Sequence, residues 1–259
     1  MPIAWKDLKN NLELLLKNWP LVLTLALTGI VFDNTLIYYA GQTASAIDMG
    51  LLDVTGPIFL VILSRIFLKT PISGQQILGL AIAVFGVIVI ILQGDLTQLS
   101  KFKLVSGDFI MLLNTFMFAV YSLLQSKRPP QVTQGALLAS TAVVGVIIIF
   151  PFMLMTVSAA KLASLLPIDY GVFIYLGVCN SVISYLAWNT ALAKIGYVKT
   201  SIIYYLLPLF SGIEAYLFLH EKLYWSQFVG GILVIGGIAL VSLGGRKKTT
   251  PQPQAAGAK

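Results

Sequence analysis

Residues 76–93 read QILGLAIAVFGVIVIILQ and contain no charged side chain. The hydrocarbon core of a bilayer is about 30 Å thick, so a helix of about 20 apolar residues can cross it. Seven further apolar runs of this kind precede or follow it. Transmembrane barrel strands are disfavoured, because polar and apolar residues do not alternate within these runs. We therefore predict an all-α polytopic membrane protein with eight transmembrane helices, at 20–40, 45–67, 76–93, 107–124, 135–157, 170–192, 198–219 and 226–244.

The composition of the 259-residue chain agrees with a membrane protein. Apolar residues make up 58% and charged residues 10%, with a mean hydropathy of +0.88, whereas a soluble domain has about 25% charged residues. The net charge of +7 does not indicate nucleic acid, because the basic residues are scattered among apolar runs. One cysteine, Cys179, and one histidine, His220, exclude an internal disulfide and a thiolate or multi-histidine metal centre. No cofactor is expected.

The basic residues predict the orientation, because Lys and Arg concentrate on cytoplasmic loops. With the N-terminus inside, 13 of the 17 basic residues fall on the cytoplasmic side, and four fall outside: Lys101, Lys103, Lys161 and Lys222. Both termini are therefore expected in the cytoplasm, and the membrane is expected to be a bacterial cytoplasmic (inner) membrane. Residues 1–19 predict an amphipathic surface segment, with a solvated linker as the alternative, and residues 246–259 predict a disordered cytoplasmic tail.

The chain contains an internal repeat. A shift of 151 residues aligns 40–90 with 191–241, and nine of the 51 aligned pairs are identical, among them Pro57/Pro208, Gln76/Gln227, Gly79/Gly230 and Gly86/Gly237. The two spans that carry Pro57 and Pro208 cross in opposite directions, so the repeat is predicted to be inverted, as in many secondary transporters. Residues 20–97 supply three helices of the first unit and 98–245 supply five of the second. The inverted five-helix repeat is therefore expected to lack the first two helices of its first unit: the counterparts of the spans 107–124 and 135–157 would lie upstream of Met1.

The repeated residues also carry a resemblance. The second copy reads Pro208-x-Phe210, Leu219-His220-Glu221, Gln227-x-x-Gly230 and Gly237, and the first reads Pro57-x-Phe59, Leu68-Lys69-Thr70, Gln76-x-x-Gly79 and Gly86. This order resembles the EamA-type repeat of the drug/metabolite transporter (DMT) superfamily over about residues 20–244. Thr70 departs from it, standing where the family usually has the Glu that Glu221 supplies. The resemblance implies ten helices in two inverted units and the export of metabolites, amino acids or drugs.

Four carboxyl groups lie inside predicted spans, where a charge is costly unless it faces a cavity or a partner: Asp33, Asp48, Asp53 and Glu214. All four fall in the outer half of their spans, an arrangement that would attract cations and protons. Burial raises the pKa of a carboxyl group, which favours proton exchange near neutral pH. Asp53 is the favoured proton or substrate site, with its repeat counterpart Tyr204 as a phenol partner. Asp48 could instead be a solvated or helix-capping acid, and Asp33 with Asn34 could form an interhelical hydrogen-bonding pair. Glu214 could be a second ionisable site or an ion-pair partner for a helix outside this chain.

Neutral polar residues supply further candidates for a cavity lining: Asn34, Asn114, Tyr121, Asn180 and Ser184. Helix–helix contacts are the alternative for each of them. Gly79 and Gly86, like Gly230 and Gly237, are seven residues apart on one helix face and predict close helix packing. Tyr38 and Trp188 lie near span ends and are interpreted as anchors at the membrane–water interface.

The predicted function is secondary active transport: export of a small polar or cationic metabolite, amino acid or drug, coupled to protons. An enzyme is disfavoured, because Asp108 lacks the setting of an intramembrane aspartyl protease and no Gly-x-x-x-x-Gly-Lys loop is present. The alternatives are a non-transporting membrane subunit or a truncated or mis-started product and, less favoured, a channel. The expected partners are the lipid bilayer, a small molecule and protons, without nucleic acid; a homodimer is left open.

Overall fold

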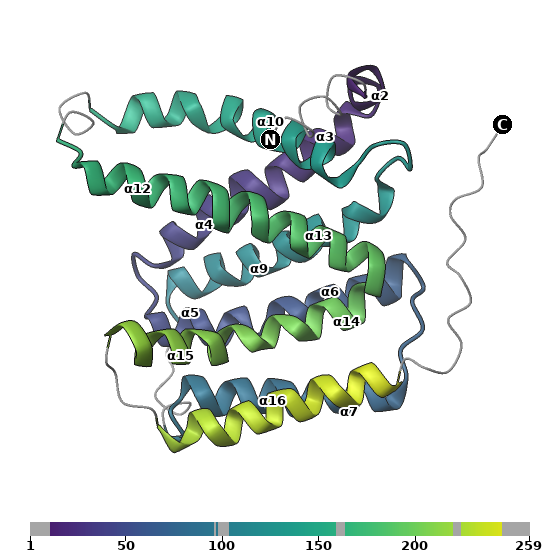
Figure 1. The fold of residues 1–259 in the computed structure, drawn as a ribbon, viewed down its shortest axis with the longest axis vertical. Helices are drawn as coiled ribbons and strands as arrows, with labels where there is room; N and C mark the ends of the chain where they lie inside the picture. Colours follow the sequence, from purple (N-terminus) through teal and green to yellow (C-terminus); the bar gives the residue numbers. More distant parts are fainter. Residues whose placement is uncertain (1–10, 96, 98–103, 159–163, 220–223, 245–259) are drawn as a thin grey trace. The chain divides into compact units, whose positions relative to one another are not determined.

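The computed structural model describes residues 11–95, 97, 104–158, 164–219 and 224–244, and the elements within these ranges are helical, without a strand (Figure 1). The predicted class is therefore confirmed. In chain order the elements are α2 (Leu12–Lys17), α3 (Trp19–Ala26), η1 (Leu27–Phe32), α4 (Asp33–Ala40), α5 (Ala46–Asp53), α6 (Thr55–Phe67), α7 (Gly74–Ile91), α9 (Ser106–Leu124), η2 (Gln125–Lys127), α10 (Gln134–Thr156), α12 (Pro167–Tyr175), η3 (Leu176–Ile183), α13 (Ser184–Ile195), α14 (Tyr197–Ile203), η4 (Tyr204–Leu206), α15 (Leu207–Leu219) and α16 (Trp225–Gly244).

Seven continuous helical stretches of the described chain are long and apolar enough to cross a membrane: Trp19–Ala40, Ala46–Phe67, Gly74–Ile91, Ser106–Lys127, Gln134–Met155, Pro167–Ile195 and Trp225–Gly244. Each corresponds to one of the eight predicted spans. The remaining prediction, 198–219, coincides with the helical elements α14, η4 and α15. It is not among the seven, so the count of eight spans stays a prediction.

The helix starts follow from local side-chain chemistry. Ser73 precedes α7, and its Oγ accepts a hydrogen bond from the backbone N–H of Gln76 at 3.2 Å, while Gln76 Oε1 accepts from the N–H of Ser73 at 2.9 Å. This capping box satisfies two backbone donors that a helix leaves unpaired at its N-terminus. Ser45 caps α5 and Thr133 caps α10 through the same kind of acceptor. Polar residues at the ends of apolar runs thus define where the spans begin.

Two spans depart from regular α geometry in their middle. The π-helical segment η1 separates α3 from α4, and the π-helical segment η3 separates α12 from α13. A π-turn adds one residue to a helical turn and is frequently found at functional sites. Asp33 is the first residue after η1, and Ser184 is the first residue after η3.

The chain divides into two compact units, which are described separately. The first comprises Met1–Leu63 and Leu104–Thr200, and the second comprises Ser64–Lys103 and Ser201–Lys259. In the first unit, α4 and η1 pack on α9, and α3 packs on α10. Its core cluster joins residues from α2, α3, α9, α10 and the loop before α10: Leu15, Val22, Leu25, Tyr121, Val132, Ala136 and Leu137.

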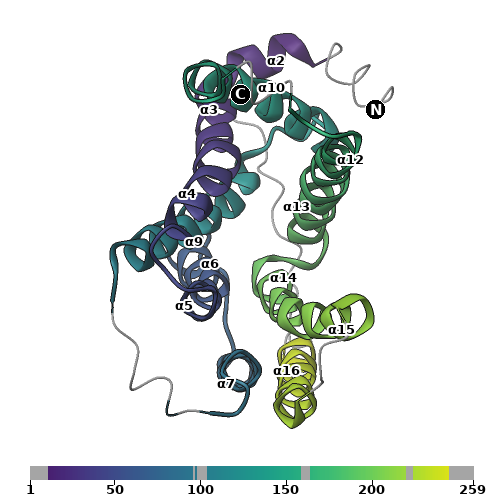
Figure 2. The ribbon, with the colours of Figure 1, turned by 90° about the vertical axis from the view of Figure 1, so that its left-hand side faces the viewer.

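In the second unit, α7 and α16 lie side by side (Figure 2). The glycine contacts between them show that they run antiparallel. A Cβ atom on Gly79 would lie 2.7 Å from the carbonyl oxygen of Gly237, and a Cβ atom on Gly86 would lie 2.7 Å from the carbonyl oxygen of Gly230. The two backbones are therefore in direct contact at both places. A side chain at any of the four positions would separate the helices, because real Cβ atoms essentially never approach a heavy atom so closely.

Several helix boundaries recur along the chain. The helices α5 and α14 begin at Ala46 and Tyr197, α7 and α16 begin at Gly74 and Trp225, and η1 and η3 end at Phe32 and Ile183. Each pair is separated by 151 residues, the shift that aligns the repeat in the sequence. These boundaries support the duplication, while the inversion of the two copies stays a prediction.

Some predictions fall on parts of the chain outside the described residues. These are the first ten residues of the amphipathic segment, the motif residues His220 and Glu221, and the tail 246–259. Of the amphipathic segment, the described part forms α2. Its Leu15 is 5% exposed and packs into the core cluster, whereas Leu12 is 50% exposed.

The close contact of α7 and α16 makes neighbouring glycines respond in opposite ways to the same substitution. Gly237→Ala places a Cβ 2.5 Å from the carbonyl oxygen of Gly79, whereas a Cβ on the adjacent Gly236 meets nothing within 4 Å. Both changes improve helix propensity by about 1 kcal/mol, so only the packing differs. We expect Gly237→Ala to lower the thermal unfolding midpoint in detergent and Gly236→Ala to leave it unchanged or raise it. Equal midpoints for the two variants would contradict the contact.

Candidate functional site

A hydrogen bond between two spans places Asp33 in the first unit. The hydroxyl of Tyr185 in α13 donates to Oδ2 of Asp33 in α4 over 2.8 Å, and the same hydroxyl also contacts the carbonyl oxygen of Gly29 in η1. Tyr185 is the second residue after η3 and Asp33 is the first after η1. The contact therefore joins the two spans that contain π-helical segments, directly beyond those segments.

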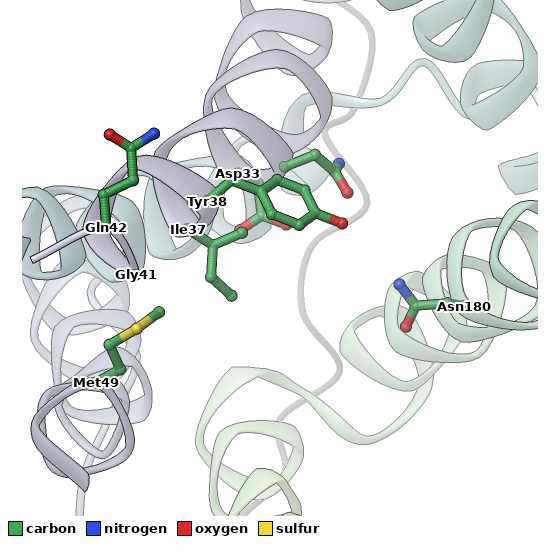
Figure 3. A pocket seen from close by; sticks show the side chains of 8 residues that line it. Asp33, Ile37, Tyr38, Gly41, Gln42, Met49 and Asn180 are labelled. Carbon is green, nitrogen blue, oxygen red and sulfur yellow. The ribbon is translucent and has the colours of Figure 1, made fainter. Parts of the chain in front are cut away.

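Asp33 also lines a pocket of about 530 Å³ (Figure 3). The other lining residues come from α4, the turn after it, α5 and η3: Asn34, Ile37, Tyr38, Gly41, Gln42, Met49 and Asn180. In Figure 3, Asn180 lies across from Tyr38, on a different helix. A volume of this size suits a small molecule, and a few polar groups among apolar ones are typical of small-molecule sites.

Asp33 is the acidic residue of this lining, whose other polar side chains are amides and a phenol. A ligand in the pocket would therefore meet one carboxyl group together with the neutral hydrogen-bonding groups of Asn34, Tyr38, Gln42 and Asn180. Asp53, the last residue of α5, is half-buried and interacts electrostatically with Asp33, although it does not line the pocket. The arrangement favours a ligand that carries a positive charge and hydrogen-bonding groups.

An aromatic cluster lies behind Asp33, between α9 and α13. The rings of Phe118 and Trp188 are 5.4 Å apart, and those of Tyr121 and Tyr185 are 5.6 Å apart in an edge-on arrangement. Tyr121 is fully buried, and a Cβ atom on Gly29 would overlap its ring. Glycine at this position thus lets the ring of α9 lie directly against η1.

Polar groups on the two helices are paired around the same cluster. Nδ2 of Asn189 donates to the hydroxyl oxygen of Tyr121 over 2.7 Å, and Nε1 of Trp188 donates to Oγ of Ser122 over 2.9 Å. Asn189 and Ser122 are both almost completely buried. Buried polar groups are costly unless they are hydrogen-bonded, so these contacts fix α13 against α9.

The structure distributes the predicted site residues unevenly. Asp33, Asn34 and Asn180 come together at the pocket, and Tyr121 lies behind it. Asn114 is buried in α9, with an Oδ1 atom that has no hydrogen-bond partner within the described residues.

The other predicted residues have different surroundings. Asp48 is in the first turn of α5, where its Oδ2 accepts from Oγ of the N-cap residue Ser45 over 2.6 Å and its backbone N–H donates to the same Oγ. Ser184 is exposed and donates to the carbonyl oxygen of Cys179 over 3.0 Å. Glu214, exposed on α15, and Tyr204, half-buried in η4, belong to the second unit.

Sequence reasoning missed several residues around the pocket. Tyr38, interpreted as an anchor at the membrane–water interface, is 73% exposed and also lines the pocket, and Trp188, interpreted in the same way, packs in the aromatic cluster. Both interpretations rested on closeness to a span end, which does not tell a lipid-facing aromatic residue from one that faces a neighbouring helix. For Gly29 the sequence offers one indication of its role: small residues within spans permit close contacts with a neighbouring helix.

The apolar helices and the pocket between them describe a polytopic membrane protein with a cavity large enough for a small molecule. The EamA-like transporter family model matches residues 1–92 and 105–243, and the chain belongs to this family. The predicted family is therefore confirmed, and with it the general class of transporter.

Several curated relatives are similar over most of the chain. An uncharacterized transporter of Archaeoglobus fulgidus is 28% identical over 86% of this chain and 76% of its own length. The uncharacterized transporter YyaM of Bacillus subtilis is 27% identical over 87% of this chain and 74% of its own. A protein named probable terminal-alkyne amino-acid exporter, from Streptantibioticus cattleyicolor, is 25% identical over 90% of this chain and 77% of its own. A solved crystal structure matches the fold with a TM-score of 0.69 at 15% identity, covering 87% of this chain and 76% of that one.

The buried pair of Tyr121 and Asn189 gives a prediction for stability. Tyr121→Phe removes the oxygen that accepts from Asn189, leaving a buried amide N–H without this partner at a cost of about 1–3 kcal/mol. We expect a lower thermal unfolding midpoint in detergent, and a partial recovery in the double variant Tyr121→Phe/Asn189→Leu. Tyr39→Phe is the matched control, because Tyr39 is 56% exposed on α4. A Tyr121→Phe variant as stable as this control would contradict the described pairing.

Proposed function

We propose that this protein is a secondary active transporter that exports a small polar or cationic metabolite, amino acid or drug in exchange for protons. The observation that carries the proposal is the carboxyl group of Asp33 in a pocket of about 530 Å³, bordered by the amides of Asn34 and Asn180. Ionisable residues inside membrane spans commonly mark substrate or proton pathways.

The chemistry of the pocket favours an ammonium group on the substrate. An ionised Asp33 would attract the cation, and the amide and phenol groups around it would satisfy further polar atoms of the same molecule. The name of the Streptantibioticus cattleyicolor relative supports this choice, since an amino acid carries an ammonium group and is small. Apolar surface from Ile37 and Met49 leaves room for a modest side chain.

Exchange for protons follows from the same carboxyl group. A carboxylate that binds a cation must be ionised, and one that holds a proton is neutral, so the two ligands exclude each other at Asp33. Mutually exclusive binding at one site is sufficient for exchange when the site opens alternately to the two sides of a membrane. Asp53 interacts electrostatically with Asp33 and would tune this competition.

The membrane arrangement is part of the proposal. We place both termini in the cytoplasm and the protein in a bacterial cytoplasmic membrane, on the asymmetry of the basic residues. Eight spans would then form an inverted repeat. The recurrence of helix boundaries after 151 residues supports its duplication, and the antiparallel contact of α7 with α16 supports its inversion. Assembly as a homodimer stays open.

The proposal predicts that transport in vesicles depends on Asp33. In proteoliposomes loaded with buffer and given a pH gradient, we expect Asp33→Asn to reduce gradient-driven transport of radiolabelled amino acids and amines by about tenfold or more, because the variant holds neither a proton nor a cation there. Asp48→Asn is the control, since Asp48 contacts the N-cap Ser45 outside the pocket lining, and the amide oxygen of Asn can still accept from Ser45 Oγ.

The comparison with Asp53→Asn separates the two carboxyl groups. The sequence favours Asp53, whereas the pocket favours Asp33. A smaller loss for Asp53→Asn than for Asp33→Asn would agree with a tuning role for Asp53. Undiminished gradient-driven transport in Asp33→Asn would refute the assignment of this site.

A further inference from the structure

The hydroxyl of Tyr185 has one hydrogen atom and two neighbours that are normally acceptors. One is the carbonyl oxygen of Gly29 in η1, and the other is Oδ2 of Asp33, 2.8 Å away. The side-chain amide of Asn34, which donates to the carbonyl oxygen of Ile30 over 2.9 Å, is a third polar neighbour of this hydroxyl. A tyrosine hydroxyl can donate once and accept through its lone pairs. The protonation state of Asp33 therefore decides which contacts can be hydrogen bonds at the same time.

The two protonation states give different hydrogen-bond counts. When Asp33 is ionised, the single hydroxyl hydrogen of Tyr185 is donated to the carboxylate, to the carbonyl oxygen of Gly29, or is shared between the two acceptors. When Asp33 carries a proton on Oδ2, the carboxyl O–H donates to the Tyr185 oxygen, and Tyr185 donates to Gly29. Both observed contacts are then complete hydrogen bonds.

We infer that Asp33 and Tyr185 form a proton-controlled latch that holds α13 against η1 when Asp33 is protonated and weakens when Asp33 is ionised. On protonation, a hydronium ion of the aqueous phase gives up one O–H bond and Oδ2 of Asp33 gains one; on release the proton returns to water by the reverse step, without redox change. Tyr185 is a positioning residue in this latch: it does not line the pocket, and it acts on a ligand through Asp33.

The latch would link the pocket to the helices, a step that rests on the proposed function. Asp33 faces the pocket and also contacts Tyr185, so a cation bound in the pocket would stabilise the ionised carboxylate. Tyr185 would then turn its hydrogen to Asp33 and give up Gly29. Cation binding and proton binding thereby favour opposite states of the contact between α13 and η1.

Several groups face Asp33 and enter the design of the test. From α9 comes the phenol of Tyr121, which interacts electrostatically with Asp33; from α5 comes Asp53; from α13 comes Tyr185. Asp53 is the other carboxyl group among them. A titration assigned to Asp33 therefore has to be separated from one that belongs to Asp53, which the variant Asp53→Asn achieves.

The first measurement is infrared difference spectroscopy of the full chain in lipid nanodiscs, without substrate, as a function of pH. We expect the C=O stretching band of a protonated carboxyl group that is lost in Asp33→Asn and kept in Asp53→Asn and Asp48→Asn. In Tyr185→Phe the band should move in frequency, because its hydrogen-bond partner is gone. Absence of any band that depends on Asp33, or an unchanged band in Tyr185→Phe, would overturn the inference.

The second measurement uses Cys179, the single cysteine of the chain, which lies in η3 before Tyr185. Cys179 is half-buried, so its alkylation by N-ethylmaleimide reports on the packing of this span. At one fixed pH we expect Tyr185→Phe to raise the alkylation rate about two- to tenfold, the range that loss of one hydrogen bond gives. Tyr175→Phe is the matched control, because Tyr175 is 63% exposed in α12.

An alkylation rate in Tyr185→Phe equal to that of the wild type would overturn the latch. Neither measurement involves transport, so the outcomes separate the two proposals. If both readouts behave as expected while vesicles transport nothing, the latch stands and the proposed function fails. If proteoliposomes transport substrate while Tyr185→Phe changes neither the infrared band nor the alkylation rate of Cys179, the latch fails and the proposed function stands.

Discussion

A carboxyl group inside an apolar span has to find specific partners, because a lipid-facing charge costs roughly 2.5–3.5 kcal/mol even on translocon-insertion scales. In this protein the hydrogen bond of Asp33 with Tyr185 meets that requirement for the pocket carboxyl group. Other features of the first unit follow from it. Each of the two residues lies just beyond a π-helical segment, and Gly29 leaves space for the aromatic ring of Tyr121 behind them. The same carboxyl group also lines the pocket.

The second unit depends on a different constraint. Lipid tails are as apolar as the helices, so spans associate through close packing of small residues instead of the hydrophobic effect. In the repeat, Gly79 corresponds to Gly230 and Gly86 to Gly237, yet Gly79 contacts Gly237 and Gly86 contacts Gly230. Exchanged contacts of this kind are those of a two-fold related pair. They are the contacts that an inverted duplication predicts for its two equivalent helices.

The helical class and seven of the spans could be predicted from the sequence, because continuous apolar runs of this length have few other structures in a membrane. The candidate carboxyl groups could also be listed, since charges there are rare. Their arrangement could not be derived. A regular helix turns about 100° per residue, so each π-turn shifts the face presented by every residue beyond it. The π-helical segments η1 and η3 therefore determine the direction in which Asp33 and Tyr185 leave their helices. No residue pattern in the sequence indicated these two segments. For the same reason Trp188, four residues past the start of α13, could not be distinguished from a lipid-facing anchor.

Under the proposed function, a proton and a cationic ligand compete for Asp33. Proton release on ligand binding tests it most directly, measured with a pH indicator in weakly buffered detergent solution, using the amine or amino acid that vesicles transport best. Near the pH at which Asp33 is half protonated, the wild type should release a measurable fraction of a proton, up to about one, for each ligand bound, whereas Asp48→Asn should behave like the wild type. Ligand binding without proton release at any pH, or equal release in Asp33→Asn, would contradict the claim.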